Sequence, residues 1–416
     1  NPHAGKTIIE MYGYMSDGIS DAVLSFNEAN ENYYIICTDR YSDSYDGDYS
    51  EINSDDDLNN LILSQNQDLS NELAMDIMNG DGPDILLNVA GLAQLNNSDY
   101  LADLTPYVGD LDSQKYFTNV IEASKIDGKL YQLPLSFSIK GIQTNAKYAG
   151  ASGVGFTVEE YEEFLKSELN GTDVITNGQA MYFVELFNAM SEKFVSNGKV
   201  DFSGPEFEKI ANFVKDYVPE TSRSWDDYSE DDDFSGVAVG ANLFPAGNEY
   251  SLGIATYGSV YSISSYFDNL YNYNEADSIL GVPSADGRGP LIEANTSIAI
   301  SAQTKELEAC GEFIKYLIND DVMKDLASYG EFVISRDAFQ VEGTKAIEAY
   351  NGEYGEIVYG FGIEGGLDYT FSQSDVDKLE EIINNCSAIS SSDADINLVL
   401  IEDMPAFFSG QKELAD

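Results

Sequence analysis

The sequence predicts an α/β protein built from two domains. A chain of 416 residues is longer than one hydrophobic core ordinarily serves, and 43% of its residues are hydrophobic, as in folded proteins. Near its start, a strand-like run at Lys6–Met15, a turn at Ser16–Gly18 and a helical pattern at Ser20–Ala29 precede a second strand-like run at Tyr33–Thr38. Strand, helix and strand at this spacing indicate a βαβ unit, and therefore a parallel sheet with a right-handed crossover.

The segments that follow extend the predicted sheet. A helix is expected at Leu58–Met78, and the apolar run Asp84–Val89, which follows a Gly-Pro pair, is typical of a strand covered on both faces. A short helix near Tyr116–Ser124 leads to two extended runs, Lys129–Leu133 and Ser136–Thr144. We expect the second domain to begin within the last of these runs.

The second domain is expected to open with a capped helix. Thr157 and Glu160 form the pattern of a capping box, which predicts a helix at Val158–Leu169. The remaining expected elements are helices at Glu185–Val195 and Phe207–Val218, a strand-like passage at Leu252–Tyr261, a strand at Glu293–Ser301 that returns to the first domain, a helix with Leu307, Cys310, Ile314 and Leu317 on one face, and closing segments at Val376–Ile389 and Leu398–Phe408.

Four short motifs occur in a fixed order along the first third of the chain. They are G-x-x-P-D-I at Gly80–Ile85, L-x-D-L-T-P-Y at Leu101–Tyr107, D-G-K-L-Y-x-L-P at Asp127–Pro134, and an extended crossing at Leu135–Asn145 that ends in Asn. In this order they resemble the extracellular solute-binding proteins of bacterial sugar ABC transporters, the maltose-binding-protein-like family 1. The resemblance spans nearly the whole chain, and Asp39–Asp57 and Asp226–Asp233 match it least.

The resemblance implies a two-lobed periplasmic-binding-protein-like fold of type II. In that fold two discontinuous lobes are joined by hinge crossings, and the ligand cleft lies between them. The expected division is residues 1–137 plus 292–333 for lobe 1, residues 141–288 plus 336–416 for lobe 2, and crossings near 136–141, 284–292 and 333–336.

The resemblance also implies a role. The protein would be the extracytoplasmic substrate-binding component of an ABC importer, a monomer that captures a neutral sugar or short oligosaccharide by hinge closure and delivers it to the permease subunits. It would be an extracellular, cell-surface lipoprotein on the outer face of the cytoplasmic membrane. The opening N-P-H-A-G-K-T, which runs straight into a strand, is what a mature domain looks like after its export segment has been removed or left out.

Candidate ligand contacts follow from the sheet and from the family pattern. In open α/β sheets, ligands bind beyond the carboxyl ends of the strands, which favours Tyr14, Ser16 and Asp17 after the first strand and Asn88 after the third. An ordinary surface loop is the alternative for each. With the positions that the resemblance suggests, the candidate ligand-binding residues are Tyr14, Asp17, Asn88, Phe137, Trp225, Tyr257, Tyr261, Asn295 and Tyr329.

The composition suits a sugar site. Aromatic faces stack on sugar rings, and planar polar groups bind the hydroxyls. The chain has 28 Tyr and 21 Phe but a single Trp, which disfavours a long oligosaccharide. A given Tyr is more often structural than ligand-facing.

The formal net charge of −52 argues against nucleic acid and anionic membrane surfaces as partners, because it would repel their phosphates. A solvated acidic coat explains this charge, and low-affinity cation binding is the alternative. Arginine is scarce, and a phosphate or uronate would need a bidentate arginine partner, so a neutral ligand is favoured. Two of the four arginines, Arg288 and Arg336, lie near predicted crossings and are expected to be structural.

No catalytic residue, cofactor or metal site is expected. The sequence has no P-loop, nucleophile elbow or H-E-x-x-H motif, and its one histidine, His3, lies in a polar start expected to be disordered. Three distant cysteines form neither a disulfide framework nor a zinc cluster, and Cys310 and Cys386 are expected in the core. The alternatives to a sugar importer component are a binding protein for a non-sugar solute, a carboxylate-driven glycoside hydrolase and a non-binding surface protein.

Overall fold

The structure, a computed structural model, describes residues 3–41, 52, 55–169, 171, 173–174, 177–196, 199–220, 254–272, 276–352 and 369–414. Trp225, a predicted ligand contact, lies outside these ranges, as do most of the acidic segment 39–57 and all of 226–233. Within the ranges, no helix combines the length and the apolar character that a bilayer crossing needs.

One mixed β-sheet runs through the molecule. Its strands in the described part are β1 (Thr7–Tyr12), β2 (Tyr33–Thr38), β3 (Ile85–Leu87), β4 (Leu133–Thr144), β5 (Gly155–Thr157), β8 (Ala255–Val260), β9 (Ser278–Ser284), β10 (Leu291–Ile300), β11 (Phe332–Val333) and β12 (Ala388–Ile389). The main path has the order β2-β1-β3-β10-β4-β9-β5, while β8 and β11 pair with β4, and β12 pairs with β10. A separate antiparallel pair is formed by β6 (Val195–Ser196) and β7 (Lys199–Val200).

The predicted βαβ unit at the start of the chain is confirmed. Strands β1 and β2 pair in parallel over six residue pairs, and β3 pairs in parallel with β1. Helix α1 (Asp17–Ala29) begins at Asp17 rather than at Ser20, so the predicted turn at Ser16–Gly18 is wrong. The reason is that Ser16 caps the helix, its Oγ accepting the N–H of Ile19 at 3.5 Å.

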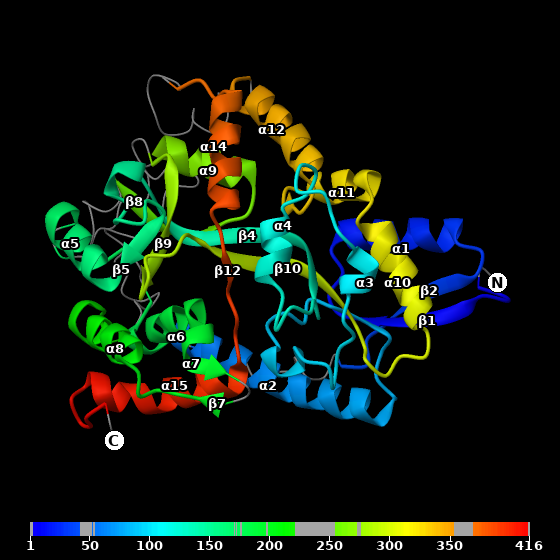
Figure 1. Ribbon diagram of the computed structural model, residues 1–416, viewed down its shortest axis with the longest axis horizontal. Coiled ribbons are helices and arrows are strands. Elements are labelled where there is room, and N and C mark those ends of the chain that lie inside the picture. Colours follow the sequence, from blue (N-terminus) through cyan, green and yellow to red (C-terminus); the bar gives the residue numbers. More distant parts are fainter. Residues whose placement is uncertain are drawn as a thin grey trace.

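Strand β4 lies near the middle of the strand order, between β10 and β9. The second predicted run, Ser136–Thr144, is confirmed within β4, but the first, Lys129–Leu133, is wrong, because the strand starts only at Leu133. Strand β4 passes through Pro134, the residue opposite Ser297 of β10. Strands β8, β9 and β10 all pair antiparallel with β4. In Figure 1, β4 and β10 cross the middle of the molecule, between the group around β1 and β2 and the group around β5 and β9.

Helices cover both halves of the sheet. Besides α1 they are α2 (Asp55–Asn79), α3 (Thr105–Val108), α4 (Thr118–Ala123), α5 (Val158–Glu168), α6 (Gln179–Ala189), α7 (Ser191–Phe194), α8 (Pro205–Tyr217), α9 (Ile263–Asn272), α10 (Leu307–Leu317), α11 (Asp320–Ala327), α12 (Arg336–Tyr350), α14 (Gln373–Asn384) and α15 (Ala394–Phe408), with short 3₁₀ turns at Ala93–Leu95 and Ala146–Tyr148. Helices α2 and α15 lie along the lower edge of the view in Figure 1, and they contact each other.

Local signals placed some helices well and others poorly. The capping box is confirmed, because the Glu160 N–H donates to Thr157 Oγ1 at 3.3 Å and the Thr157 N–H donates back to Glu160 at 2.8 Å. The helix predicted at Glu185–Val195 is wrong in both bounds, since α6 starts at Gln179 and ends at Ala189, where Met190 leaves the helical conformation. The segment predicted at Val376–Ile389 divides into α14 and the short strand β12.

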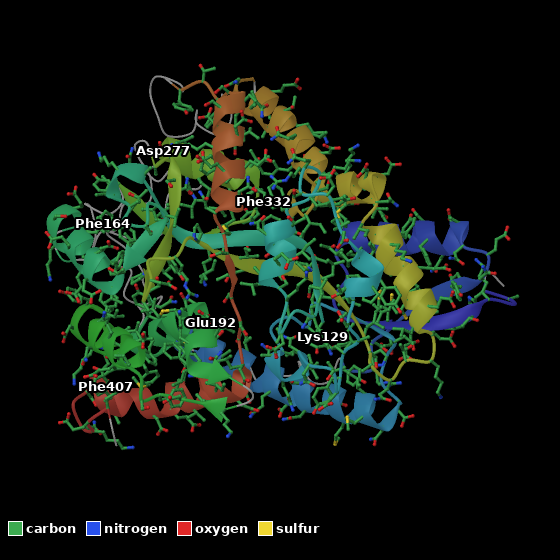
Figure 2. The ribbon with its side chains drawn as sticks, in the orientation of Figure 1. Lys129, Phe164, Glu192, Asp277, Phe332 and Phe407 are labelled. Atoms are coloured by element: carbon green, nitrogen blue, oxygen red, sulfur yellow. The ribbon has the colours of Figure 1, made fainter. Side chains whose placement is uncertain are left out.

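Three groups of buried apolar side chains hold these layers together. The first joins the sheet around β1 and β4 to α10, α12 and α14 through residues such as Ile9, Phe137, Phe313, Phe339 and Val376. The second packs α5, α6, α8 and α15 around β9, and a smaller third lies under α2. In Figure 2, Phe164 and Phe407 lie among the elements of the second group, Lys129 lies in the opposite half, and Phe332 lies near the middle. Residues of α12 and α14 thus pack with the first group, and the division into two lobes at the predicted boundaries stays a prediction.

The cysteines are placed as their surroundings predicted. Cys310 and Cys386 are buried in the first apolar group, and burial raises the pKa of the Cys310 thiol to about 12. Cys37 lies on β2 and is exposed, with its Sγ 3.3 Å from the sulfur of Met15. His3, expected in a disordered start, instead packs against the ring of Tyr34, with ring centroids 4.9 Å apart.

Candidate functional site

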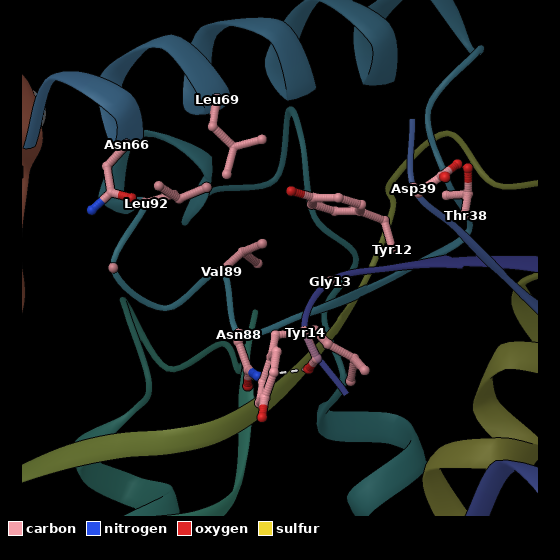
Figure 3. A pocket seen from close by; sticks show the side chains of 12 residues that line it. Tyr12, Gly13, Tyr14, Thr38, Asp39, Asn66, Leu69, Asn88, Val89 and Leu92 are labelled. Atoms are coloured by element: carbon pink, nitrogen blue, oxygen red, sulfur yellow. Dashed lines mark hydrogen bonds between the residues drawn. The ribbon is translucent and has the colours of Figure 1, made fainter. Parts of the chain in front are cut away.

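A cavity of about 590 Å³ opens where β1, β2 and β3 end (Figure 3). Its floor is formed by residues that follow the strands, and its far wall comes from Leu69 and Asn66 of α2. The carboxyl ends of parallel strands meet at this edge, which is where an open α/β sheet places its ligand. The cavity lies within the range of volumes, roughly 300–1,000 Å³, that small-molecule sites commonly have.

Asn88 builds the junction between β3 and the segment after β1. Its side-chain Nδ2 donates to the carbonyl of Tyr14 at 2.9 Å, and its Oδ1 accepts the backbone N–H of Ser297 at 3.0 Å. The residue has a left-handed φ of 58°, which Asn tolerates better than most side chains. Asn88, a predicted ligand contact, lines the cavity, but both ends of its amide bind backbone groups, and so the side chain positions Tyr14.

Gly13 lets β1 approach β3 closely. A Cβ added at Gly13 would lie 2.3 Å from the carbonyl oxygen of Leu87, and its φ is 125°, so no other residue fits there without strain. The approach directs the chain so that Tyr14 leaves the sheet immediately afterwards.

Tyr14 separates two adjoining cavities. It is 77% exposed, and it lines both the large cavity and a second one of about 220 Å³. The second cavity is lined by Asp17 and Tyr329, which were predicted as ligand contacts, and by Ser136 and Glu331, which were not. The structure therefore brings Tyr14, Asp17, Asn88 and Tyr329 together around one pair of cavities.

Tyr329 is held in place from α1. Its hydroxyl donates to Asp21 at 2.8 Å, and this bond, together with the charges of neighbouring aspartates, raises the pKa of the phenol. Its ring packs against the first turn of α1, since a Cβ at Gly18 would lie 3.0 Å from a ring carbon. Half of the side chain stays exposed, facing the smaller cavity.

A row of polar side chains leads from the smaller cavity along the middle of the sheet. Ser136, Ser138 and Lys140 occupy alternate positions of β4, so they share one face of the strand. Ser136 donates to Glu331, and Ser138 donates to Asn295 Oδ1 of β10 at 3.1 Å.

Lys140 ends this row between two carboxylates. Its Nζ lies 3.6 Å from Glu185 of α6 and 3.5 Å from Glu293 of β10. Burial alone would lower the pKa of Lys140, but the two carboxylates outweigh burial and the pKa rises, so the ammonium stays charged. The hydroxyl of Tyr257 donates to Glu185, and Ser259 donates to Glu293 at 2.6 Å.

The other predicted contacts lie elsewhere. Tyr257 and Asn295 belong to the polar row and line neither cavity, and Tyr261 is an exposed residue just after β8. The prediction for Phe137 is corrected, because its side chain is fully buried between Phe117 and Phe332. Residues alternate between the two faces of a strand, and Phe137 is on the face opposite Ser136 and Ser138.

Several site residues were missed by sequence reasoning. The alternation of Ser136, Ser138 and Lys140 in S-F-S-I-K is a readable signal for a polar face of a buried strand. Glu185 and Glu331 carry no such signal, since they reach the site from elements far away in the chain.

The site is acidic. Among the described residues that line the two cavities are the carboxylates of Asp17, Asp39 and Glu331, and none of these lining residues is a Lys or Arg. In the described part of the chain, no three His, Cys, Asp or Glu side chains gather in a way that could hold a metal ion. The arrangement offers aromatic faces, hydroxyls and carboxylate acceptors, which suit a polyhydroxylated ligand.

The chain has clear similarity to known proteins. The family model described as bacterial extracellular solute-binding protein matches residues 60–351. The solved structure of the sugar-binding protein MalE from Xanthomonas citri is similar over 98% of this chain and 94% of its own, with a TM-score of 0.56 and 12% identity.

Two further solved structures show the same likeness. The likeness to a periplasmic oligogalacturonide binding protein from Yersinia enterocolitica extends over 98% of this chain and 95% of that protein, with 13% identity and a TM-score of 0.53. The likeness to a cyclic alpha-maltosyl-1,6-maltose binding protein from Arthrobacter globiformis extends over 99% of this chain and 95% of that protein, with 14% identity and a TM-score of 0.51. At such identities the likeness establishes the fold alone, and it confirms the predicted two-lobed, periplasmic-binding-protein-like architecture.

Proposed function

Because the chain belongs to the family of bacterial extracellular solute-binding proteins, we propose that it captures a sugar or short oligosaccharide and delivers it to the permease of an ABC importer. Membership of this family implies a location outside the cytoplasm. Attachment to the outer face of the cytoplasmic membrane through a lipid anchor, and a monomeric state, are parts of the proposal.

The observation that carries the proposal is the placement of Tyr14. An exposed aromatic ring stands between two cavities at the carboxyl ends of β1 and β3, which is where the fold places a ligand. Its face can stack on the C–H side of a sugar ring, while Asp17, Glu331 and Ser136 can bind hydroxyls. Apolar side chains such as Leu69 and Leu92 would bury the rest of the ring.

The size and charge of the site limit the sugars that it can bind. A cavity of about 590 Å³ with a neighbour of about 220 Å³ accommodates one or a few sugar units rather than a long chain. The carboxylates that line the cavities would repel a uronate, and no lining arginine offers the bidentate contact that a uronate favours. These features support a ligand without negative charge.

Capture by hinge closure fits the way the sheet is built. Strands β10 and β4 are neighbours in the middle of the strand order, and β11 pairs with β4, which supports a hinge at these strands. We propose that the ligand contacts Tyr14 from one half and the polar row ending at Lys140 from the other, which favours the closed arrangement as a population shift. No reaction is catalysed in this scheme.

The test is thermal unfolding in the presence of a panel of mono- and oligosaccharides, with polyols and amino acids as controls. A ligand at about 100 times its dissociation constant stabilises a protein by roughly 2.7 kcal/mol. We expect one sugar to raise the melting temperature while its stereoisomers do not. Stabilisation by an amino acid or polyol alone would contradict the sugar assignment and favour the non-sugar solute, and no stabilisation by any solute would favour the non-binding surface protein.

A further inference from the structure

We propose that the solute carries a protonated amine, as in an amino sugar, and that its ammonium group binds in the smaller cavity between Tyr14 and Tyr329. This inference rests on the proposed function and names the substrate class of the same site. It goes beyond a neutral sugar because it assigns a positive charge to one end of the ligand.

The first support is the supply of acceptors in the smaller cavity. Its described lining includes the carboxylates of Asp17 and Glu331 and the hydroxyls of Ser16, Ser136 and Thr296, without a Lys or Arg. Glu331 accepts one hydrogen bond, from Ser136, and among the described residues Asp17 accepts none through its side chain. The serine and threonine hydroxyls can donate as well as accept, so they serve a sugar hydroxyl and an ammonium alike. The two carboxylates only accept, and their charge favours an ammonium, which has three donors and a full positive charge.

The second support is the pair of tyrosine rings. Tyr14 is 77% and Tyr329 is 49% exposed, and both line the cavity. The face of a tyrosine ring attracts a cation within about 6 Å of its centroid. Tyr329 cannot turn away freely, since its hydroxyl is bonded to Asp21 and its ring rests on Gly18.

The N-terminus of α1 opposes the binding of a cation in the smaller cavity. It lies at the cavity, and the positive end of a helix dipole, equivalent to roughly half an elementary charge, favours anions. Two full carboxylate charges, at Asp17 and Glu331, outweigh it, and Asp21 on the next turn adds a third. The balance at the cavity is therefore negative.

The two cavities also differ in polarity, as a ligand with a sugar ring and an amine requires. The larger cavity is lined largely by apolar groups, including Leu69, Leu87, Val89 and Leu92. The smaller one also contains Leu135 and Leu326, but most of its lining side chains carry a hydroxyl or a carboxylate. Tyr14 belongs to both. A sugar ring could lie over Tyr14 in the larger cavity and direct an amine into the smaller one.

The experiment uses matched sugar triplets that differ only at one carbon: glucose, glucosamine and N-acetylglucosamine, the same three for galactose, and the corresponding β1,4-linked disaccharides. Calorimetric titrations are run at about pH 6, where an amine with a pKa near 7.7 is protonated. In at least one triplet we expect the amine to bind about tenfold tighter than both neutral members, as one hydrogen bond to a charged group would give. The preference should shrink as salt is added.

Two variants connect the preference to the cavity. In Glu331→Gln and in Asp17→Asn the affinity ratio of amine to hydroxyl sugar should fall towards one, and the amide oxygen introduced by Glu331→Gln can still accept from Ser136. The matched control is Glu163→Gln, which removes one charge from an exposed position of α5 and should keep the ratio. Equal affinities throughout the triplets, or an amine preference that survives both variants combined, would overturn this inference while the proposed function stands. If no sugar of any kind binds, both are overturned.

Discussion

The side-chain amide of Asn88 donates to the backbone carbonyl of Tyr14 at 2.9 Å, so the residue after β3 fixes the residue that leaves β1. On its other side the same amide accepts the N–H of Ser297 in β10. Three strands that are distant in sequence are thereby joined where the exposed ring of Tyr14 reaches both cavities. The geometry of the site depends on this junction.

Replacing Asn88 should therefore cost stability and affinity together. Asn88→Ala removes two hydrogen bonds and leaves at a left-handed φ a residue that tolerates this conformation less well than Asn, which we expect to destabilise the protein by about 2 kcal/mol. Asn88→Gly loses the same bonds without the strain and should be less destabilised than Asn88→Ala. Urea denaturation measures both. Wild-type stability for Asn88→Ala would show that the junction is not needed.

Because β1 approaches β3 closely at Gly13, we expect a side chain at this position to destabilise the protein strongly. In Gly13→Ala the new Cβ would collide with the carbonyl of Leu87 at 2.3 Å, at a φ of 125°, so we expect a loss of more than about 3 kcal/mol in the free energy of unfolding. Gly91→Ala is the matched control, since Gly91 lines the same cavity and its added Cβ would meet nothing within 4 Å. Comparable stability of the two variants would contradict the account.

A pH-dependent contribution is expected from Asp103. Its Oδ1 accepts the N–H of Leu130 at 3.2 Å and both the N–H and the hydroxyl of Thr105, which connects two of the family motifs. Burial raises the pKa of Asp103, but these bonds outweigh burial and the pKa is lowered on folding. A lowered pKa means that the stability it contributes is present above the unfolded value, near 3.9, and is lost as the pH falls.

Asp103→Asn should reveal that contribution. We expect a loss of roughly 1 kcal/mol at neutral pH, allowing for solvent screening of a partly exposed group, and a smaller difference from the wild type below about pH 3. Denaturant titrations at both pH values provide the measurement. A difference that stays constant with pH would mean that the charge of Asp103 is not involved.

Much of the fold was predictable because its signals are local. The βαβ unit was readable from two strands and a helix with little between them, and the capping box from Thr157 and Glu160 alone. The bounds of α6 were not readable, since the run Q-A-M-Y-F-V-E-L-F-N-A is apolar on nearly every side and gives no period from which to place an end.

The site was predictable only in part, for a different physical reason. Tyr14, Asp17 and Asn88 follow strands, and the rule about strand ends finds them. Phe137 was chosen for its place in a crossing, although the side of a strand on which a residue lies depends on its position in the alternation. The arrangement of Lys140 between Glu185 and Glu293 joins three elements that only the folded chain brings together.

The most direct test of the central claim is a calorimetric titration of wild type, Tyr14→Ala and Tyr14→Phe with the sugar that most stabilises the protein. Because Tyr14 is 77% exposed, Tyr14→Ala should melt near the wild-type temperature but lose about tenfold or more in affinity, as expected for one stacking contact, while Tyr14→Phe keeps the ring and most of the affinity. Unchanged affinity in Tyr14→Ala would contradict the claim that the sugar binds at the carboxyl ends of β1 and β3.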